Sequence, residues 1–169
     1  PARRTMLINF GRAISSRISL ATGMEDLALR ADHDNSSLAS AAVFDPTGTY
    51  LFVALETSRE VAVLDAAKGS PLFRINVGLA PQGLAVSADG QRLYVHNFMG
   101  RNVSVVNLSP LVNNGELAST LAATWTSVGT EKLGATVLLG KQFFYDARDT
   151  RLARDAYMSC ASCHNDGEH

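Results

Sequence analysis

The feature that most constrains the fold of this chain is an internal repeat. Gly48 aligns with Gly90, an offset of 90 − 48 = 42 residues, and the alignment continues without a gap from Leu51/Leu93 to Arg59/Arg101. Repeats with periods of about 40 to 45 residues and several strands per period are typical of β-propeller blades. We therefore predict a mainly β chain that contains part of a β-propeller.

Each copy of the repeat contains short β-rich runs separated by turn residues. In the second copy these runs are 83–87, 92–97 and 102–108, and Asp89-Gly90 marks the first turn between them. Such spacing predicts antiparallel hairpins. Two unrelated hairpins that happen to align would give a similar pattern, and this alternative stays open.

The repeat also resembles a known family. Leu93-Tyr94-Val95-His96-Asn97 is similar to the Leu-Tyr-Val-Thr-Asn of YVTN-type β-propellers, with His96 departing from the pattern. The resemblance covers about residues 35–110, and it implies a fold more than a function. We assign residues 1–112 to a partial YVTN-like propeller, because two blades cannot close a ring that needs about four or more.

The pattern changes after Pro110. Residues 113–130 form a predicted connector, in which 116–128 suit either a linker or an outer strand. A helix is expected from Thr130, its cap, to Asp146, with Leu133, Val137 and Phe144 on one apolar face.

The stretch Cys160-Ala161-Ser162-Cys163-His164 carries the clearest chemistry. In Cys-x-x-Cys-His, two residues between the cysteines let both sulfurs reach the vinyl groups of one haem, and the next histidine lies under the ring. We predict that Cys160 and Cys163 form the thioethers of a covalent haem c and that His164 is the axial ligand of its iron.

Two other uses of these residues stay open. A redox-active dithiol would need a βαβ setting, which the surrounding pattern lacks. A zinc site could also use Asp166 or His169, but the second ligand pair that structural zinc usually draws from about a dozen residues away is missing.

The flanks of this motif resemble the start of the di-haem cytochrome c peroxidases, including the MauG-type enzymes. Residues 139–148 are similar to the Leu-Gly-Lys-x-Leu-Phe-Phe-Asp-x-Arg of that family, and 159–165 to its Ser-Cys-x-x-Cys-His. Phe143 replaces the usual Leu, and Tyr145 is an extra residue before the aspartate. The resemblance spans 133–169 and implies that 131–169 is the truncated, α-helical start of a cytochrome c-like domain.

In that family one haem takes up electrons and another reduces peroxide. The resemblance therefore implies that a second haem, the distal ligand and the catalytic residues, which are unknown here, lie beyond His169. On this view the chain is a fragment, and the fragment alone is not expected to be active.

Composition limits the partners. There are 15 basic and 16 acidic residues, a formal net charge of −1, and no long apolar run. Neither nucleic acid nor an anionic membrane is an expected partner, and no transmembrane segment is expected.

We thus expect a periplasmic or cell-surface bacterial protein that exchanges electrons with a donor or acceptor redox protein and with a small oxidant such as peroxide. One alternative is a surface-binding propeller module with a simple electron-transfer haem. Another is a propeller dehydrogenase of the quinone or amine type.

The remaining histidines and the tryptophan are assigned structural or solvent roles. His33 is expected in a solvated polar loop, His96 in a strand as a packed or edge residue, and His169 at the surface. Trp125 is expected to pack in a core or an interface.

Overall fold

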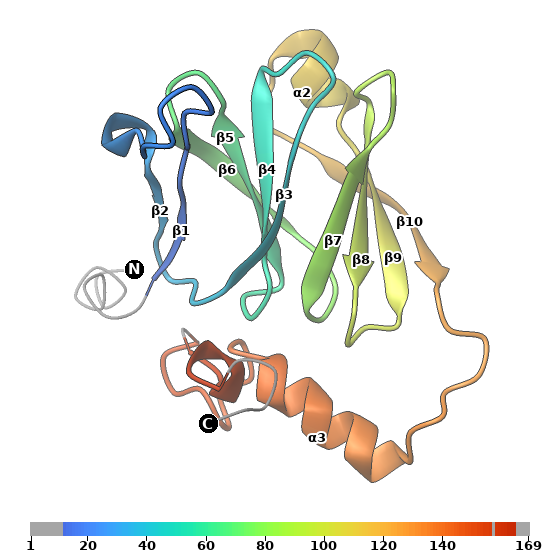
Figure 1. The fold of residues 1–169 in the computed structure, drawn as a ribbon. Coiled ribbons are helices and arrows are strands. Elements are labelled where there is room, and N and C mark those ends of the chain that lie inside the picture. Colours follow the sequence, from blue (N-terminus) through green and yellow to red (C-terminus); the bar gives the residue numbers. More distant parts are fainter. Residues whose placement is uncertain (1–11, 157, 165–169) are drawn as a thin grey trace.

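The computed structural model describes residues 12–156 and 158–164. Two four-stranded antiparallel sheets lie side by side, a short hairpin flanks the first sheet, and a helical C-terminal segment lies across one end of both (Figure 1). The prediction of a mainly β chain is confirmed.

The first sheet contains the first copy of the repeat. Its strands follow one another in space as β3 (Ala39–Phe44), β4 (Tyr50–Leu55), β5 (Glu60–Asp65) and β6 (Ser70–Asn76). The β3–β4 turn is fixed by Asp45, whose carboxylate accepts hydrogen bonds from the amides of Thr47 at 3.1 Å and of Tyr50 at 2.7 Å.

The second sheet contains the second copy, in β7 (Pro81–Val86), β8 (Arg92–Asn97) and β9 (Asn102–Asn107). Its fourth strand, β10 (Thr120–Thr126), pairs with β9. This blade therefore extends beyond the boundary at residue 112 that the sequence predicted.

The boundary was misplaced because a helix interrupts the repeat. The short helix α2 (Ser109–Asn114) follows β9 directly and ends on Gly115, which adopts φ +68°. This insertion shifts the outer strand away from the 42-residue register, so of the two expectations for 116–128 the outer strand is the one found.

The main core lies between the two sheets. Phe52, Val61 and Val63 of the first sheet pack against Leu93 and Val106 of the second, and all are fully buried. Alternate residues of β4 point to opposite faces. The other face of the first sheet, with Val53 and Leu55, packs against the flanking hairpin.

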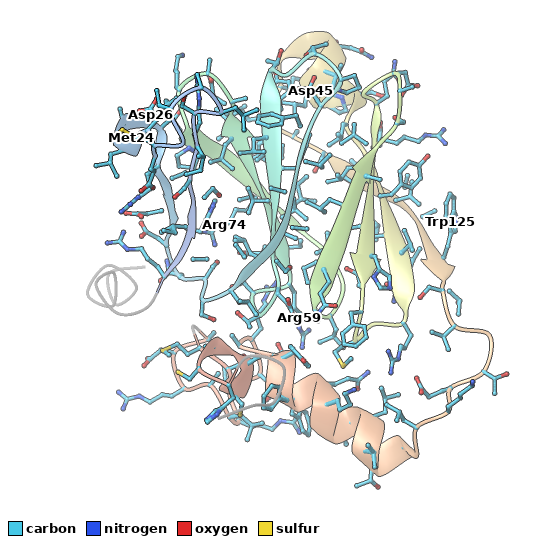
Figure 2. All side chains as sticks on the ribbon, viewed as in Figure 1. Met24, Asp26, Asp45, Arg59, Arg74 and Trp125 are labelled. Atoms are coloured by element: carbon cyan, nitrogen blue, oxygen red, sulfur yellow. The ribbon has the colours of Figure 1, made fainter. Side chains whose placement is uncertain are left out.

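Equivalent positions of the repeat thus face the same way in each blade. Tyr94 of β8 takes the place of Phe52, but it lies on the open face of the second sheet beside Trp125, with ring centroids 5.9 Å apart. Figure 2 shows Trp125 at the outer side of this sheet, away from the first one. His96 is exposed on the same face of β8, which is an inner strand, so His96 is neither a packed nor an edge residue.

The flanking hairpin is formed by β1 (Ala13–Ser15) and β2 (Ala31–His33), with the short 3₁₀ helix η1 (Leu27–Leu29) between them. His33 is buried here, with 2% of its surface exposed, and its Nε2 lies 2.6 Å from Ser15 Oγ. The expectation that His33 is solvated was wrong, because His33 itself belongs to the paired strand β2 and not to a loop.

Burial makes His33 pH-sensitive. Desolvation, helped by the nearby Arg74 guanidinium, lowers the pKa of His33 to about 4 from its usual 6.5, against the opposing charges of Asp32 and Asp34. As the pH falls, His33 therefore becomes protonated at a higher pH in the unfolded chain than in the folded one.

We predict that stability is full above pH 6.5 and decreases as the pH falls from there through about 4. The loss attributable to His33 is roughly 3 kcal/mol near pH 4. Urea unfolding of the parent and of His33→Gln at neutral pH and near pH 4 checks this, because other titrations are common to both proteins. Equal losses in the two proteins would contradict the prediction.

The C-terminal segment contains α3 (Ala135–Tyr145) and the 3₁₀ turn η2 (Cys160–Ser162). Among residues 12–156 and 158–164, none of the helices has the length and apolarity needed to cross a lipid bilayer.

Candidate haem-attachment site

The predicted motif occupies a single tight turn. The amides of Cys163 and His164 both donate to the carbonyl of Cys160, at 3.2 and 3.0 Å. The amide of Ser159 donates to Ser162 Oγ at 2.8 Å, which closes the turn from the other side. Both cysteines are exposed free thiols.

The propeller holds this turn through a chain of hydroxyls. Ser162 Oγ, which belongs to the second variable residue of the motif, lies 2.6 Å from Ser37 Oγ. Ser37 in turn lies 2.8 Å from Thr57 Oγ1, in the β4–β5 turn. The motif is thus attached to the first blade as well as to its own helix.

The motif lines a pocket of about 380 Å³. Its wall combines apolar side chains with the two thiols, the imidazole and one carboxylate, from Phe143, Asp146, Leu152, Ala153, Met158, Ser159, Cys160, Cys163 and His164. Figure 1 shows η2 folded back beside the C-terminal end of α3, which brings the motif next to the last residues of that helix.

These residues fit a covalently attached haem. Both cysteines and His164 line the same pocket, and an apolar wall suits a porphyrin face. Across the described ranges, no three His, Cys, Asp or Glu side chains gather as a metal site. Zinc requires converging ligands, whereas thioether attachment requires two sulfurs held apart. Asp166 and His169 lie outside the described residues.

A dithiol site fits less well. Every strand pairing in the described part of the chain is antiparallel, so the βαβ unit typical of a thioredoxin-like motif does not frame these cysteines.

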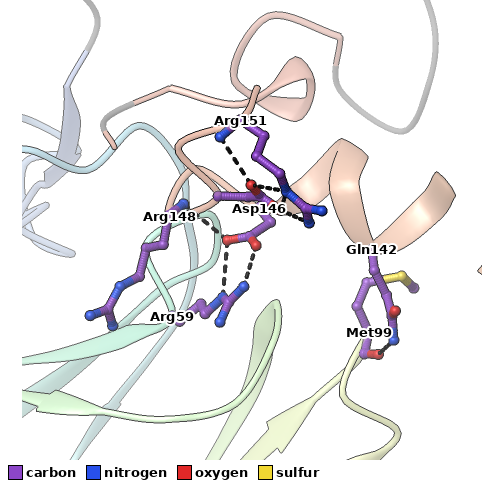
Figure 3. Close-up of polar contacts among 7 residues, drawn as sticks. Arg59, Met99, Gln142, Asp146, Arg148 and Arg151 are labelled. Carbon is purple, nitrogen blue, oxygen red and sulfur yellow. Dashed lines mark hydrogen bonds and ion pairs between the residues drawn. The ribbon is translucent and has the colours of Figure 1, made fainter. Parts of the chain in front are cut away.

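An ion pair links the pocket to the propeller. Arg59, in the β4–β5 turn, donates from Nε to Asp146 Oδ1 at 2.9 Å and from Nη2 to Oδ2 (Figure 3). Asp146, the residue after α3, is 4% exposed, and its Oδ1 also accepts the amide of Arg148 at 2.9 Å. The amide of Ala147 donates to the carbonyl of Thr57 at 2.9 Å.

The second blade makes the corresponding contact. Arg101, one repeat after Arg59, donates from Nε to Glu131 Oε2 at 2.8 Å. The amide of Leu133 and then Arg101 lower the pKa of Glu131. Arg59 and Arg101 also share a left-handed backbone, with φ +55° and +54°.

Further contacts fasten α3 itself. Gln142 Nε2 donates to the carbonyl of Met99 at 3.0 Å (Figure 3), and Tyr145 packs edge-on against Phe98. Lys141 lies over the Phe98 ring, 5.7 Å from its centroid. Both blades therefore contact the C-terminal segment and hold it in place.

The loop between α3 and the motif is ordered by its own charges. Arg151 makes a paired contact with Asp149, and this side-chain hydrogen bonding lowers the pKa of Asp149 to about 2. The Arg151 guanidinium also covers the Phe143 ring at 5.0 Å. Asp149 and Arg151 therefore pack within the loop, whereas Ala147 and Arg148 at its start contact the propeller.

The predicted helix is shorter than expected. It begins at Ala135, after Gly134, and not at Thr130, while its end before Asp146 is as predicted. Glu131 is used outside the helix, where it accepts the Leu133 amide and pairs with Arg101. Val137 is 56% exposed, so the expected apolar face was wrong.

Sequence reasoning missed the arginine contacts. The repeat alignment pairs Arg59 with Arg101, and a long cationic side chain kept at one turn position in two blades was a signal for a shared ionic role. Their acidic partners, Asp146 and Glu131, lie in the C-terminal segment. No local sequence pattern predicts where this segment packs on the blades.

The comparisons with known proteins concern the fold. No family model and no curated protein matches the chain. A 6-phosphogluconolactonase-like protein from Bacteroides uniformis aligns with a TM-score of 0.54 and 15% identity, over 73% of this chain and 37% of that one.

Two further structures give the same result. The β-propeller domain of Myceliophteria thermophila Cps50 (Swd1) aligns with a TM-score of 0.54 and 13% identity, over 66% of this chain and 37% of that one. Dihydro-haem d1 dehydrogenase NirN in complex with DHE aligns at 0.50 and 18%, over 66% and 22%.

The chain spans between 22% and 37% of the length of these structures. At such identities the likeness concerns the fold alone. The YVTN and di-haem peroxidase resemblances, by contrast, stay predictions. The two four-stranded sheets and these likenesses together assign the β-propeller fold to this chain.

Proposed function

We propose that the chain is part of a bacterial redox protein that carries haem c covalently at Cys160 and Cys163, with His164 as the axial ligand. The observation that carries this proposal is the pocket in which both thiols and the imidazole meet an apolar wall. The bound group would supply one-electron chemistry at its iron.

The residues of this chain would attach and orient the group. Each thiol would add across a vinyl group, so that a carbon–sulfur bond would form, the thiol proton would pass to the other vinyl carbon, and no group would leave. The η2 turn would hold the sulfurs in place, and Phe143, Leu152 and Met158 would give the bound group apolar contacts. Attachment at such a site occurs outside the bacterial cytoplasm, which supports a periplasmic or cell-surface location.

The resemblance of 133–169 to di-haem peroxidases supports a further proposal. The whole protein would accept electrons from a redox partner and reduce a small oxidant such as peroxide, with a second haem in a part of the protein beyond this chain. The alternative, a surface-binding propeller with a simple electron-transfer haem, would need no second haem.

Haem staining after denaturation tests the attachment. We expect the chain, expressed with a haem c maturation system, to keep haem through denaturing electrophoresis and to lack reactive thiols. Expression without the maturation system is the control, and it should give colourless protein with two reactive cysteines. Colourless protein from the competent host would overturn the proposal. Peroxide turnover by the encoded full-length protein separates the peroxidase from the simple carrier.

A further inference from the structure

The wall of the proposed haem pocket contains one carboxylate. Among the described residues that line it, Asp146 is the only acidic one, and its neighbours there include Phe143, Leu152 and Met158. A charge beside an apolar cavity acts more strongly than one in water, because little solvent screens it. The state of Asp146 therefore matters to any redox group in the pocket.

The cation that balances Asp146 comes from the propeller. Arg59 donates hydrogen bonds to both carboxylate oxygens of Asp146, and the Asp146 side chain is 4% exposed. The nearby Asp149 and Arg151 balance each other, and the Arg148 guanidinium donates to Asn76 at 2.8 Å. Arg59 is thus the partner on which the net charge at this wall depends.

We propose that Arg59 is a positioning residue of the haem site, through which the propeller holds Asp146 and sets the charge, and hence the reduction potential, of the pocket. This inference rests on the proposed function. It gives the propeller a role in the electron chemistry that a separate binding module would not have.

Electrostatics gives the two partners opposite effects. Reduction adds one negative charge at the site, so an unbalanced carboxylate opposes it and an unbalanced guanidinium favours it. Loss of Arg59 should therefore lower the midpoint potential, and loss of the Asp146 charge should raise it. A purely structural role would not give shifts of opposite sign.

Spectroelectrochemical titration of the haem-loaded chain tests this. We expect a lower midpoint potential in Arg59→Gln, a higher one in Asp146→Asn, and a value near the parent in the double variant. The side-chain carbonyl introduced by Asp146→Asn can still accept the Arg148 amide. Arg59→Lys, which keeps the cation, should stay closer to the parent than Arg59→Gln. High salt should reduce each shift.

Arg101→Gln is the matched control. It removes the equivalent arginine, at the same backbone conformation, from the ion pair with Glu131, which does not line the pocket. We expect no shift in potential. Shifts in the same direction for Arg59→Gln and Asp146→Asn, or an equal shift in Arg101→Gln, would overturn the inference.

The two proposals fail in different ways. Absence of covalent haem from the parent overturns the proposed function and this inference with it. Normal haem content with unchanged potentials overturns this inference alone. If Arg59→Gln does not fold, as judged by circular dichroism, a potential in Asp146→Asn that is not raised suffices to overturn it.

Discussion

Replacing both Cys160 and Cys163 with alanine is expected to abolish covalent haem completely. Neither sulfur would remain to bond a vinyl group, and these are the only cysteines of the chain. The haem stain after denaturation should fall from one haem per chain to background, which is the largest change we predict.

Single variants refine this test. Cys160→Ala or Cys163→Ala alone should leave one thioether, so haem stays attached while its pyridine haemochrome spectrum shifts toward that of a porphyrin with a free vinyl. His96→Ala serves as the control, because His96 is an exposed histidine of β8 far from the motif in sequence. Covalent haem in the double variant would refute the assignment.

The second large effect concerns the core. Phe52→Ala should destabilise the chain by about 3 to 5 kcal/mol, because it opens a cavity where Phe52 is fully buried between the two sheets. Such a loss is a large part of the stability of an ordinary domain, about 5 to 15 kcal/mol. Urea unfolding followed by circular dichroism measures it.

Tyr94→Ala is the matched control for Phe52→Ala. Tyr94 occupies the equivalent position one repeat later, but on the open face, where its main aromatic partner is Trp125. Its loss should cost only about 1 kcal/mol. Equal losses in the two variants would show that the contact between the sheets is not the main core.

Much of the fold follows from the repeat. The 42-residue offset, the Asp-Gly turn and the alternation of β8 predict the inner strands, because hairpins depend on local turn chemistry and on a period of two. The fourth strand was not predicted firmly, since α2 separates it from the repeat. The pairing of β10 with β9 depends on tertiary contacts, and no local sequence pattern predicts it.

Of the candidate site, the sequence predicted only the attachment motif, and covalent haem there stays a prediction. Cys-x-x-Cys-His is readable because five adjacent residues meet one geometric requirement. Arg59 and Asp146 are 87 residues apart, and only the fold brings them together. His33 was misjudged for a related reason, because its polar neighbours predict exposure while β1 covers it.

The left-handed backbone conformation of Arg59 and Arg101 has a consequence for protein engineering. Backbone energetics alone would favour glycine or asparagine at these two turns, by about 1 kcal/mol each. Replacing both arginines with glycine would remove this backbone strain. It would also remove the two ion pairs, Arg59–Asp146 and Arg101–Glu131, that join the blades to the C-terminal segment. Such variants would gain thermal stability in the blades and lose attachment of the C-terminal segment, so the two properties have to be screened separately.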